Sequence, residues 1–378
     1  MTFVLTEEQN MLRDAAMDFS KEQLSLTHFR QQRDAGANGK DADSWSSMSE
    51  MGWAGVLVPE EFGGSDFGYV GLGQVLEAQG RTLASTPLLQ TALIGVSALM
   101  LGGSAAQREK LLPKIAEGAI TTALAVDEKT HHAPLKTAMK AEKSGSGFTL
   151  TGKKTFVDDG HSADLLIVAA RTSGAPGDKA GITLFLVPRD ASGISVQELK
   201  TLDYHGAANI SFDGVEVSAD DVLGPVDGGW DILEGILDRA CIGMASEMLG
   251  TAIAAFEMTH EYLQTRKQFG QLIGSFQSLQ HRAAIMFSEL EQTRSCVAAA
   301  LSALDENANN ISQMASLAKA RACDTLHLVS NETIQMHGGI GMTDAHDSGF
   351  YIKRARVQEA LYGGAGYHKD RYATSLGF

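Results

Sequence analysis

The chain is poor in cysteine, and that shortage excludes two kinds of covalent scaffold. Its three cysteines, Cys241, Cys296 and Cys323, lie far apart in helical patterns. Neither a disulfide framework nor a CxxC metal site can form at such spacings. We expect all three to be small buried hydrophobic residues, and the sequence predicts no metal site.

Basic residues are also scarce, with 31 Lys and Arg against 46 Asp and Glu and a formal net charge of −15. Proteins that bind nucleic acid or dock on an anionic membrane surface present a basic face. The charge balance therefore argues against both partners. A few arginines can still bind a small anionic ligand locally.

No charged segment followed by an apolar stretch opens the sequence, and no run of about 18 apolar residues occurs in it. We therefore expect a cytoplasmic location. The 378 residues are 44% hydrophobic and 20% charged, as in a soluble globular protein with room for two or three domains.

The pattern along the chain divides into three segments. Residues 1–120 have the apolar spacing of helices and begin with a capping box from Thr6 to Gln9. Residues 121–225 contain short runs of β-branched residues bounded by Gly, Asp and Ser, which predicts antiparallel strands. Residues 226–378 return to long helices rich in Ala, Gly and Ser, which allow close packing in an antiparallel bundle. Helices are expected at 44–52, 69–83, 88–102, 105–117, 228–266, 276–304, 310–337 and 345–362.

The predicted fold class is thus α+β, with an N-terminal helical domain, a β-barrel-like middle domain and a C-terminal four-helix bundle. An order of helical, β and helical segments would be unusual for a Rossmann or barrel protein.

Polar residues interrupt the apolar pattern in the stretch EYLQTRKQFGQLIGSFQSLQHRAAIM at 261–286. The guanidinium of Arg266 has the planar fork that binds a pyrophosphate through two parallel hydrogen bonds. A solvated cation at a helix end is the alternative. Phe269 and Phe276 can equally be core residues, and His281 an ordinary helix histidine.

A second signature reads Gln335-x2-Gly338-Gly339-x-Gly341. A helix C-cap that needs a positive φ would explain Gly338. It does not explain the second glycine or Gln335, whereas backbone without a Cβ atom lets a cofactor approach closely.

Together these motifs resemble the acyl-CoA dehydrogenase family over nearly the whole chain. The likeness rests on Tyr262-x3-Arg266-x-Gln268-Phe269-Gly270, Phe276-Gln277-x2-Gln280-His281 and the glycine signature. Weaker similarities are Val58-Pro59-Glu60-Glu61-Phe62-Gly63-Gly64 and Leu112-Pro113-x3-Glu117-Gly118. The stretches RTSGAPGDKAGITLFLV, TRKQFGQLIGSFQSLQHRAA and MHGGIGMTD most resemble the small subunits of pimeloyl-CoA dehydrogenase-type enzymes.

The resemblance implies a flavoprotein of fatty acid metabolism that binds FAD between the β domain and the bundle, partly in a neighbouring subunit. A base would take the α-proton of an acyl-CoA thioester and flavin N5 the β-hydride, with an electron-transfer flavoprotein or similar acceptor downstream. A dimer or tetramer is implied, which can include a second acyl-CoA dehydrogenase-like chain. The family pattern implies that FAD contacts come from Arg266, Gln268, Phe269, Phe276, Gln277, Gln335, Gly338 and Gly339, and from Val126, Phe156 and Asp158.

The chain departs from the family in the segments that face the flavin. The usual Thr-Glu-Pro and Gly-Ser-Asp elements are replaced by Val126-Asp127-Glu128 and the residues up to Pro134. Asp127 occupies the position of a hydroxyl donor in the family pattern. Its negative charge would disfavour a reduced anionic flavin unless a cation pairs with Asp127. In the run Phe156-Val157-Asp158, Phe156 keeps an aromatic surface, but Asp158 can donate a hydrogen bond only when protonated. No further ligand accompanies His131 and His132, so they predict no metal site.

The family's usual catalytic glutamate is Gly363 here, and the alternative position for a base falls near Ala240. Neither side chain can accept a proton. Glu247 lies two turns further along the same helix in an apolar run, where desolvation would raise its pKa and suit it to general-base catalysis. The alternative is a glutamate paired with an arginine on a neighbouring helix. Asp238 beside Arg239 is a weaker candidate and is expected to form a surface pair.

Two functions remain open from the sequence. The chain is either an active acyl-CoA dehydrogenase with Glu247 as its base, or a non-catalytic or half-catalytic subunit that completes a partner's FAD site. A binding or scaffold protein on the same fold is a third and weaker hypothesis.

Overall fold

The computed structural model describes residues 4–39 and 41–378, which cluster into two compact units. The helical unit contains Met1–Gln31, Tyr69–Ala84 and Cys241–Phe378, and the sheet unit contains Gln32–Gly68 and Ser85–Ala240. The predicted fold class is confirmed, with helices, a mostly antiparallel sheet and helices again in chain order. The division of the chain at residues 120 and 225 stays a prediction.

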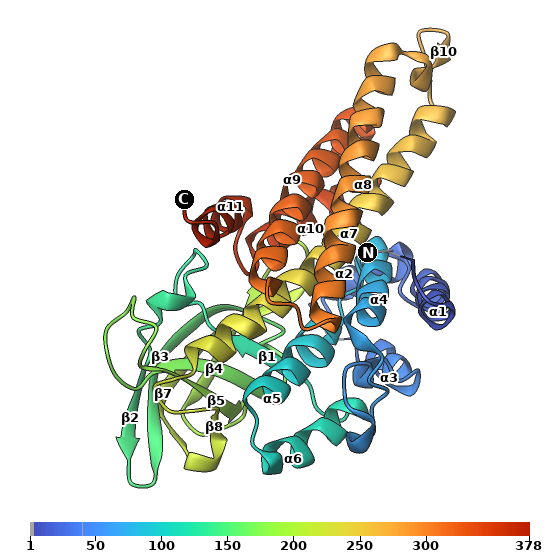
Figure 1. Cartoon of the computed structure of the whole chain (residues 1–378). Helices are drawn as coiled ribbons and strands as arrows, with labels where there is room; N and C mark the ends of the chain where they lie inside the picture. The colour runs from blue at the N-terminus through green and yellow to red at the C-terminus, as the bar shows by residue number, and fades with distance from the viewer. Residues whose placement is uncertain (1–3, 40) are drawn as a thin grey trace. The chain divides into compact units, whose positions relative to one another are not determined.

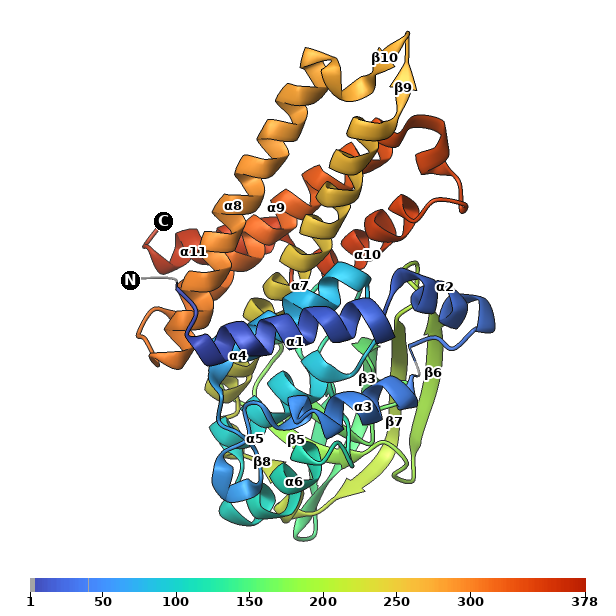
Figure 2. The same cartoon turned by 90° about the vertical axis from the view of Figure 1, so that its right-hand side faces the viewer.

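The helical unit is built on long helices that run side by side (Figures 1 and 2). They are α7 (Trp230–Thr265), whose first turns belong to the sheet unit, α8 (Gln277–Asp305), α9 (Ile311–His337) and α10 (Ser348–Ala360). The short helix α11 (Ala365–Ser375) follows them at the end of the chain. The helix α9 contacts α8, α10 and α11. At the far end of α7 and α8, β9 (Lys267–Gln268) and β10 (Gln271–Leu272) form a hairpin (Figure 2).

Two glycines bring α4 (Gly68–Thr82) against the backbone of α7. A Cβ atom on Gly80 would lie 2.0 Å from the carbonyl oxygen of Glu247, and one on Gly250 would lie 1.9 Å from that of Glu77. Any side chain at either position would therefore push the helices apart. The close crossing places the Glu247 turn of α7 beneath α4.

By length and hydropathy alone, α7 could cross a membrane. However, 78% of its most apolar stretch is buried inside the protein, as in a core helix. At its start α1 (Glu7–Gln23) has the predicted capping box, because the Thr6 hydroxyl accepts from Gln9 N at 3.2 Å and Gln9 Oε1 accepts from Thr6 N at 3.0 Å.

The sheet unit contains an eight-stranded sheet in the order β6-β7-β3-β2-β4-β5-β8, with β1 beside β4. The strands are β1 (Thr122–Ala125), β2 (Lys140–Ser144), β3 (Gly147–Asp158), β4 (Leu165–Arg171), β5 (Ile182–Pro188), β6 (Ile194–Lys200), β7 (Gly206–Val217) and β8 (Val222–Leu223). Most pairs are antiparallel as predicted, but β4 pairs with β1 and β2 in parallel. Alternate residues of β3 and β7 bury a common core that includes Leu150, Ile210 and Phe212.

A register shift in β3 opposite β7 sets the positions of its last residues. The shift lies between Lys154 and Val157, and Phe156 there has a φ of +49°. A β-bulge of this kind redirects a side chain out of the alternating pattern. Phe156 is accordingly 40% exposed.

Helices also surround the sheet within its own unit. They are α3 (Ala42–Glu50), α5 (Val96–Gly102), α6 (Ala105–Ala116), short 3-10 turns such as η1 (Trp53–Gly55), and the π-helix η3 (Leu89–Gly95). The sequence predicted one regular helix over 88–102, whereas the first half is π-helical. It did not predict α2 (Leu26–Ala35), β2 or α11.

Candidate functional site

The two signature segments of the helical unit lie next to each other. Tyr262, one turn before Arg266, stacks on His337, with ring centroids 4.4 Å apart. Gly338 follows His337 directly, so the stack brings the end of α7 to the glycine turn at the end of α9. The sequence spacing alone could not show this proximity, because 71 residues separate Arg266 from His337 along the chain.

Arg266 lies just after the last turn of α7, and its side chain is exposed. Its backbone amide donates to Tyr262 O at 2.9 Å, and its carbonyl accepts from Ile273 N at 2.9 Å. Within the described part of the chain no carboxylate pairs with its guanidinium. The hydrogen bonds thus fix the backbone and leave the fork available to an anion.

The glycine turn offers an open backbone surface. Gly338 has a φ of +63°, which favours glycine, and a Cβ atom on either Gly338 or Gly339 would meet no atom within 4 Å. Packing within this chain therefore does not require the second glycine. Gln335, one turn earlier on α9, is also exposed.

The hairpin presents aromatic side chains at the same end of the bundle. Phe269 is 91% exposed at the hairpin tip with a φ of +53°, and it meets Phe276 edge to face at 6.1 Å. An exposed, strained phenylalanine makes little contribution to this chain's own core. Gln268 and Gln277 lie exposed beside them.

These features of the helical unit fit the phosphate and adenosine portion of FAD. An unpaired guanidinium, a backbone turn without side chains and exposed amides are the groups that bind a dinucleotide phosphate. The roles of Arg266, Gln268, Phe269, Phe276, Gln277, Gln335, Gly338 and Gly339 stay predictions, but the structure brings the two signatures together.

In the sheet unit, by contrast with the open groups of the helical unit, the candidate residue Asp158 already has a hydrogen-bond partner. Its Oδ2 atom accepts a hydrogen bond from Gln90 Nε2 at 3.1 Å. The amide orientation of Gln90 is fixed because its Oε1 atom accepts from Leu124 N at 3.1 Å. The Oδ2 atom of Asp158 is therefore held as an acceptor.

Asp127 is held as an acceptor in the same way. Its Oδ1 atom accepts from Ala133 N at 3.0 Å, and its Oδ2 atom lies 2.8 Å from His132 Nδ1. The partner of His132 is thus this carboxylate. Among the described residues no group of three or more His, Cys, Asp and Glu side chains could hold a metal ion.

A buried ion pair stabilises the strand segment beside Asp127. Lys154 is fully buried, and its ammonium donates to Glu128 Oε1 at 2.8 Å and to Val126 O at 2.9 Å. Burial lowers the pKa of Lys154, and the charge of Glu128 partly offsets that effect. Val126 is buried and contributes its backbone carbonyl to this lysine, while Phe156 keeps an exposed ring.

At two positions of the sheet unit, carboxylates therefore stand where the resemblance implies hydroxyl donors to a flavin ring. Both positions that the resemblance assigns to hydroxyl donors hold carboxylates whose oxygens already accept hydrogen bonds. The predicted contacts of Val126, Phe156 and Asp158 with the cofactor stay untested.

Glu247 forms a buried ion pair. Its Oε1 atom accepts from Arg354 Nη2 at 2.6 Å, from Arg354 Nε at 3.2 Å and from Gln358 Nε2 at 2.9 Å. Glu247 and Arg354 are 7% and 5% exposed. The structure thus shows the arrangement that the sequence left as the alternative to a general base, and the catalytic role of Glu247 stays a prediction.

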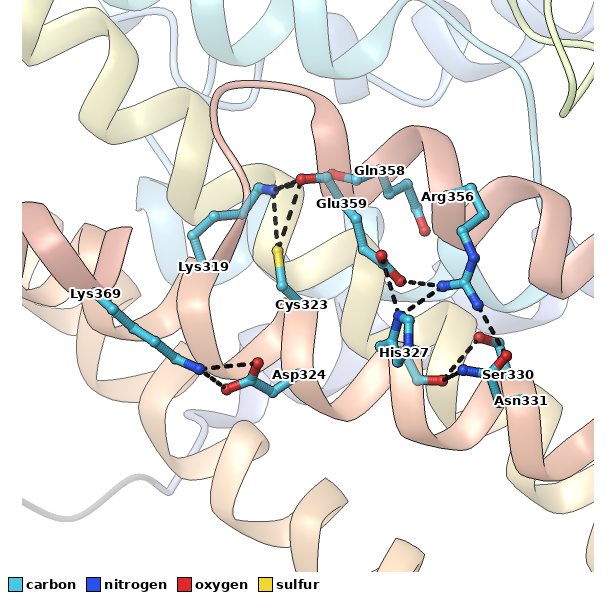
Figure 3. A network of polar contacts seen from close by, with 10 residues as sticks. All are labelled: Lys319, Cys323, Asp324, His327, Ser330, Asn331, Arg356, Gln358, Glu359 and Lys369. Atoms are coloured by element: carbon cyan, nitrogen blue, oxygen red, sulfur yellow. Dashed lines mark hydrogen bonds and ion pairs between the residues drawn. The ribbon is translucent and has the colours of Figure 1, made fainter. Parts of the chain in front are cut away.

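The turn that replaces the usual base is closely built. Gly363 has a φ of +98°, and a Cβ atom there would lie 2.5 Å from the ring of Tyr367. The ammonium of Lys319, which is fully buried, donates to Gly363 O at 3.1 Å and to Gln358 O at 2.9 Å. Figure 3 shows Lys319 reaching the last carbonyls of α10, where a cation is favoured by the helix dipole. Neither Gly363 nor the buried Ala240 can accept a proton.

Sequence reasoning missed the partners that define these sites. Arg354, Gln358 and Lys319 lie on α9 and α10, and Gln90 lies on η3. A charged residue in an apolar helical run, such as Lys319 between Ala318 and Ala320, signals a buried pair or cap but does not identify its partner.

Comparison with known proteins matches three family models in chain order. They are the acyl-CoA dehydrogenase N-terminal domain at residues 6–119, the middle domain at 125–215 and the C-terminal domain at 227–377. Mitochondrial isovaleryl-CoA dehydrogenase of Pongo abelii is 31% identical, over 94% of this chain and 85% of its own.

Two solved structures share the fold over the full length of this chain. Butyryl-CoA dehydrogenase from Megasphaera elsdenii matches with a TM-score of 0.93 and 26% identity, covering 100% of both chains. A chain of the ChsE4-ChsE5 complex from Mycobacterium tuberculosis matches with a TM-score of 0.90 and 25% identity, covering 100% of this chain and 99% of its own. These similarities do not confirm the pimeloyl-CoA dehydrogenase subtype. The chain belongs to the acyl-CoA dehydrogenase family, whose members are FAD-dependent oxidoreductases that act on the CH–CH bond of acyl-CoA thioesters.

Proposed function

We propose that this chain is the cofactor-completing subunit of a heteromeric acyl-CoA dehydrogenase. In this assembly its helical unit binds the phosphate and adenosine portion of FAD, while a second acyl-CoA dehydrogenase-like chain holds the flavin ring and supplies the catalytic carboxylate. Acyl-CoA is the substrate and an electron-transfer flavoprotein the expected acceptor. A cytoplasmic location belongs to the same proposal.

The observation that carries this proposal is the contrast between the two units. In the helical unit, the Arg266 fork and the Gly338–Gly339 backbone are open to a ligand. In the sheet unit, Asp127 and Asp158 are acceptors locked by His132 and Gln90. A carboxylate whose oxygens accept hydrogen bonds repels the negative charge that develops on a flavin, and it donates no hydrogen bond to the flavin ring.

Loss of a base in this chain supports the same division of labour. When bound, FAD supplies the acceptor for the hydride from the β-carbon. The α-proton must then go to a base, and Gly363 and Ala240 have none. The carboxylate of Glu247 is engaged by Arg354 and Gln358, which both donate to its Oε1 atom.

Each residue of this chain then has a defined task. Arg266 neutralises the diphosphate, and Gly338 and Gly339 allow the ligand to approach the backbone. Exposed aromatic residues at the hairpin, Phe269 above all, exclude water at the contact with the partner chain. Family membership is compatible with assemblies of two different chains, because one structural neighbour is such a complex.

Purification of the chain alone, followed by flavin spectroscopy and an acyl-CoA assay with an artificial electron acceptor, tests the proposal. We expect a nearly colourless and inactive protein that becomes yellow and active only with its partner chain. A yellow, active homomer whose turnover is lost in Glu247→Gln would instead support the homomeric enzyme with Glu247 as base.

A further inference from the structure

Three aromatic side chains join the two cofactor signatures of the helical unit. The ring of His337 contacts those of Tyr262 and His346 at centroid distances of 4.4 Å each, and the Tyr262 and His346 rings meet edge to face at 6.4 Å. Tyr262 comes from α7, His337 from the end of α9 and His346 from the segment before α10. We call these three residues the aromatic clamp, and it spans both ends of the 338–346 segment.

Hydrogen bonds fix the protonation state of His337. Its Nδ1 atom lies 2.7 Å from the carbonyl oxygen of Thr333 and must therefore donate. Its Nε2 atom is enclosed and has no hydrogen-bond partner among the described residues. A proton on Nε2 would thus bury a charged donor without an acceptor.

His346 contacts the start of α10. Its Nδ1 atom lies 3.2 Å from the backbone amide nitrogen of Ser348, the first residue of α10, and 3.0 Å from the Ser348 hydroxyl oxygen. The imidazole therefore holds the end of the 338–346 segment to the N-terminus of a helix, where backbone amides are free.

Other charged groups near the clamp do not favour a protonated His337. Asp344 and Asp347, from the segment before α10, pair with Arg30 from α2. On α7, the charged neighbour of Tyr262 is the exposed Glu261, and the cationic Arg266 follows the end of the helix. Burial lowers the pKa of His337 below its ordinary value of 6.5, the hydrogen bond to Thr333 O opposes this, and the neighbouring His346 lowers it further.

We propose that the aromatic clamp is a pH-sensitive positioning device that holds the Gly338–Gly339 turn against the end of α7 only while His337 is neutral. This inference rests on the proposed cofactor role of Arg266 and the glycine turn. The clamp's contribution is full above the ordinary histidine pKa of 6.5 and is lost as the pH falls below it, because the unfolded chain then binds protons that the clamp excludes. Acid therefore opens the 338–346 segment and releases the dinucleotide.

Hydrogen exchange of the full chain without FAD tests the clamp itself. Amide exchange in the 338–346 segment, corrected for intrinsic rates, should accelerate by up to ~10-fold between about pH 7.5 and pH 5.5. The variant His337→Phe/His346→Asn keeps the stacked ring and an acceptor for Ser348 N but cannot titrate, so its protection should stay constant. His260→Phe, which replaces an exposed histidine on α7, should behave like the unaltered chain.

Retention of FAD by the assembly with its partner chain, measured over the same pH range by flavin fluorescence, tests the link to the cofactor. Retention that falls with acid in the unaltered chain but not in the non-titrating variant supports the inference. Equal exchange of this segment at both pH values would overturn the clamp. If exchange responds to pH while FAD retention does not, the clamp stands as a structural device and the proposed cofactor role of this turn is refuted.

Discussion

Replacing Glu247 with glutamine separates a structural carboxylate from a catalytic one. Glu247→Gln removes the charge that pairs with Arg354 while keeping an oxygen that can accept from Arg354 and Gln358. Both members of the pair are less than a tenth exposed, and the contact distance is 2.6 Å. An arginine left without a counterion in such a place destabilises the fold.

The expected magnitude follows from the burial of the pair. Removing one partner of a buried ion pair costs about 3–5 kcal/mol. Because the substituted amide retains an oxygen that accepts hydrogen bonds, we expect the lower end, about 3 kcal/mol, or for a chain of this length a melting temperature lower by roughly 4 °C. Glu247→Leu/Arg354→Met removes both charges and should recover part of the loss.

Urea unfolding followed by circular dichroism gives the free energies, and turnover of the assembled enzyme gives the catalytic effect. Glu289→Gln, in the more exposed Glu289–Arg321 pair between α8 and α9, is the matched control and should cost less than about 1 kcal/mol. Turnover per folded Glu247→Gln assembly should be nearly unchanged. A variant with unaltered stability and turnover reduced by ~100-fold or more would refute the reasoning and identify Glu247 as the base.

Three further predictions concern the cofactor end and the turn after α10. Arg266→Gln should weaken FAD binding of the assembly by about tenfold or more while leaving the unfolding midpoint of the chain unchanged, with Lys267→Gln as a neighbouring control, as measured by flavin titration. Gly363→Glu should not create an active homomer, and its positive φ should make the substitution destabilise the chain by about 1–2 kcal/mol or more. Gly363→Glu/Tyr367→Ala should regain stability because it removes the clash with the Tyr367 ring. Equal unfolding midpoints for the two variants would contradict this. Lys319→Met leaves the buried carbonyls at the end of α10 without their donor and should cost about 1–3 kcal/mol in urea unfolding, and an unchanged midpoint would show that Lys319 does not hold the turn.

The long helices and the strands were predictable because their apolar periodicity extends over many residues. The segment 310–337 matches α9 within a residue, and Thr6 to Gln9 forms the capping box that its residue types indicate. The short helix α11 was missed because it follows Gly363-Gly364, which resembles the end of a helix and the start of a loop. The parallel pairing of β1 and β4 depends on strand order, which periodicity does not encode.

The candidate site could be predicted in residue identity but not in pairing. Arg266 and the glycine signature were visible as motifs, while the Tyr262–His337 contact that joins them depends on how α7 packs against α9. Glu247 could be recognised as a carboxylate in an apolar run, but Arg354 lies 107 residues away in sequence. Tertiary contacts, not local pattern, decide whether a buried carboxylate is paired or free to act as a base.

The flavin content of the chain purified without a partner tests the central claim most directly. We expect far less than one FAD per chain, and FAD bound in the assembly should be lost when Arg266 of this chain is changed to glutamine. A homomer that carries one tightly bound FAD per chain and oxidises acyl-CoA would contradict it, because the acceptor-locked Asp127 and Asp158 would then be compatible with a working flavin site.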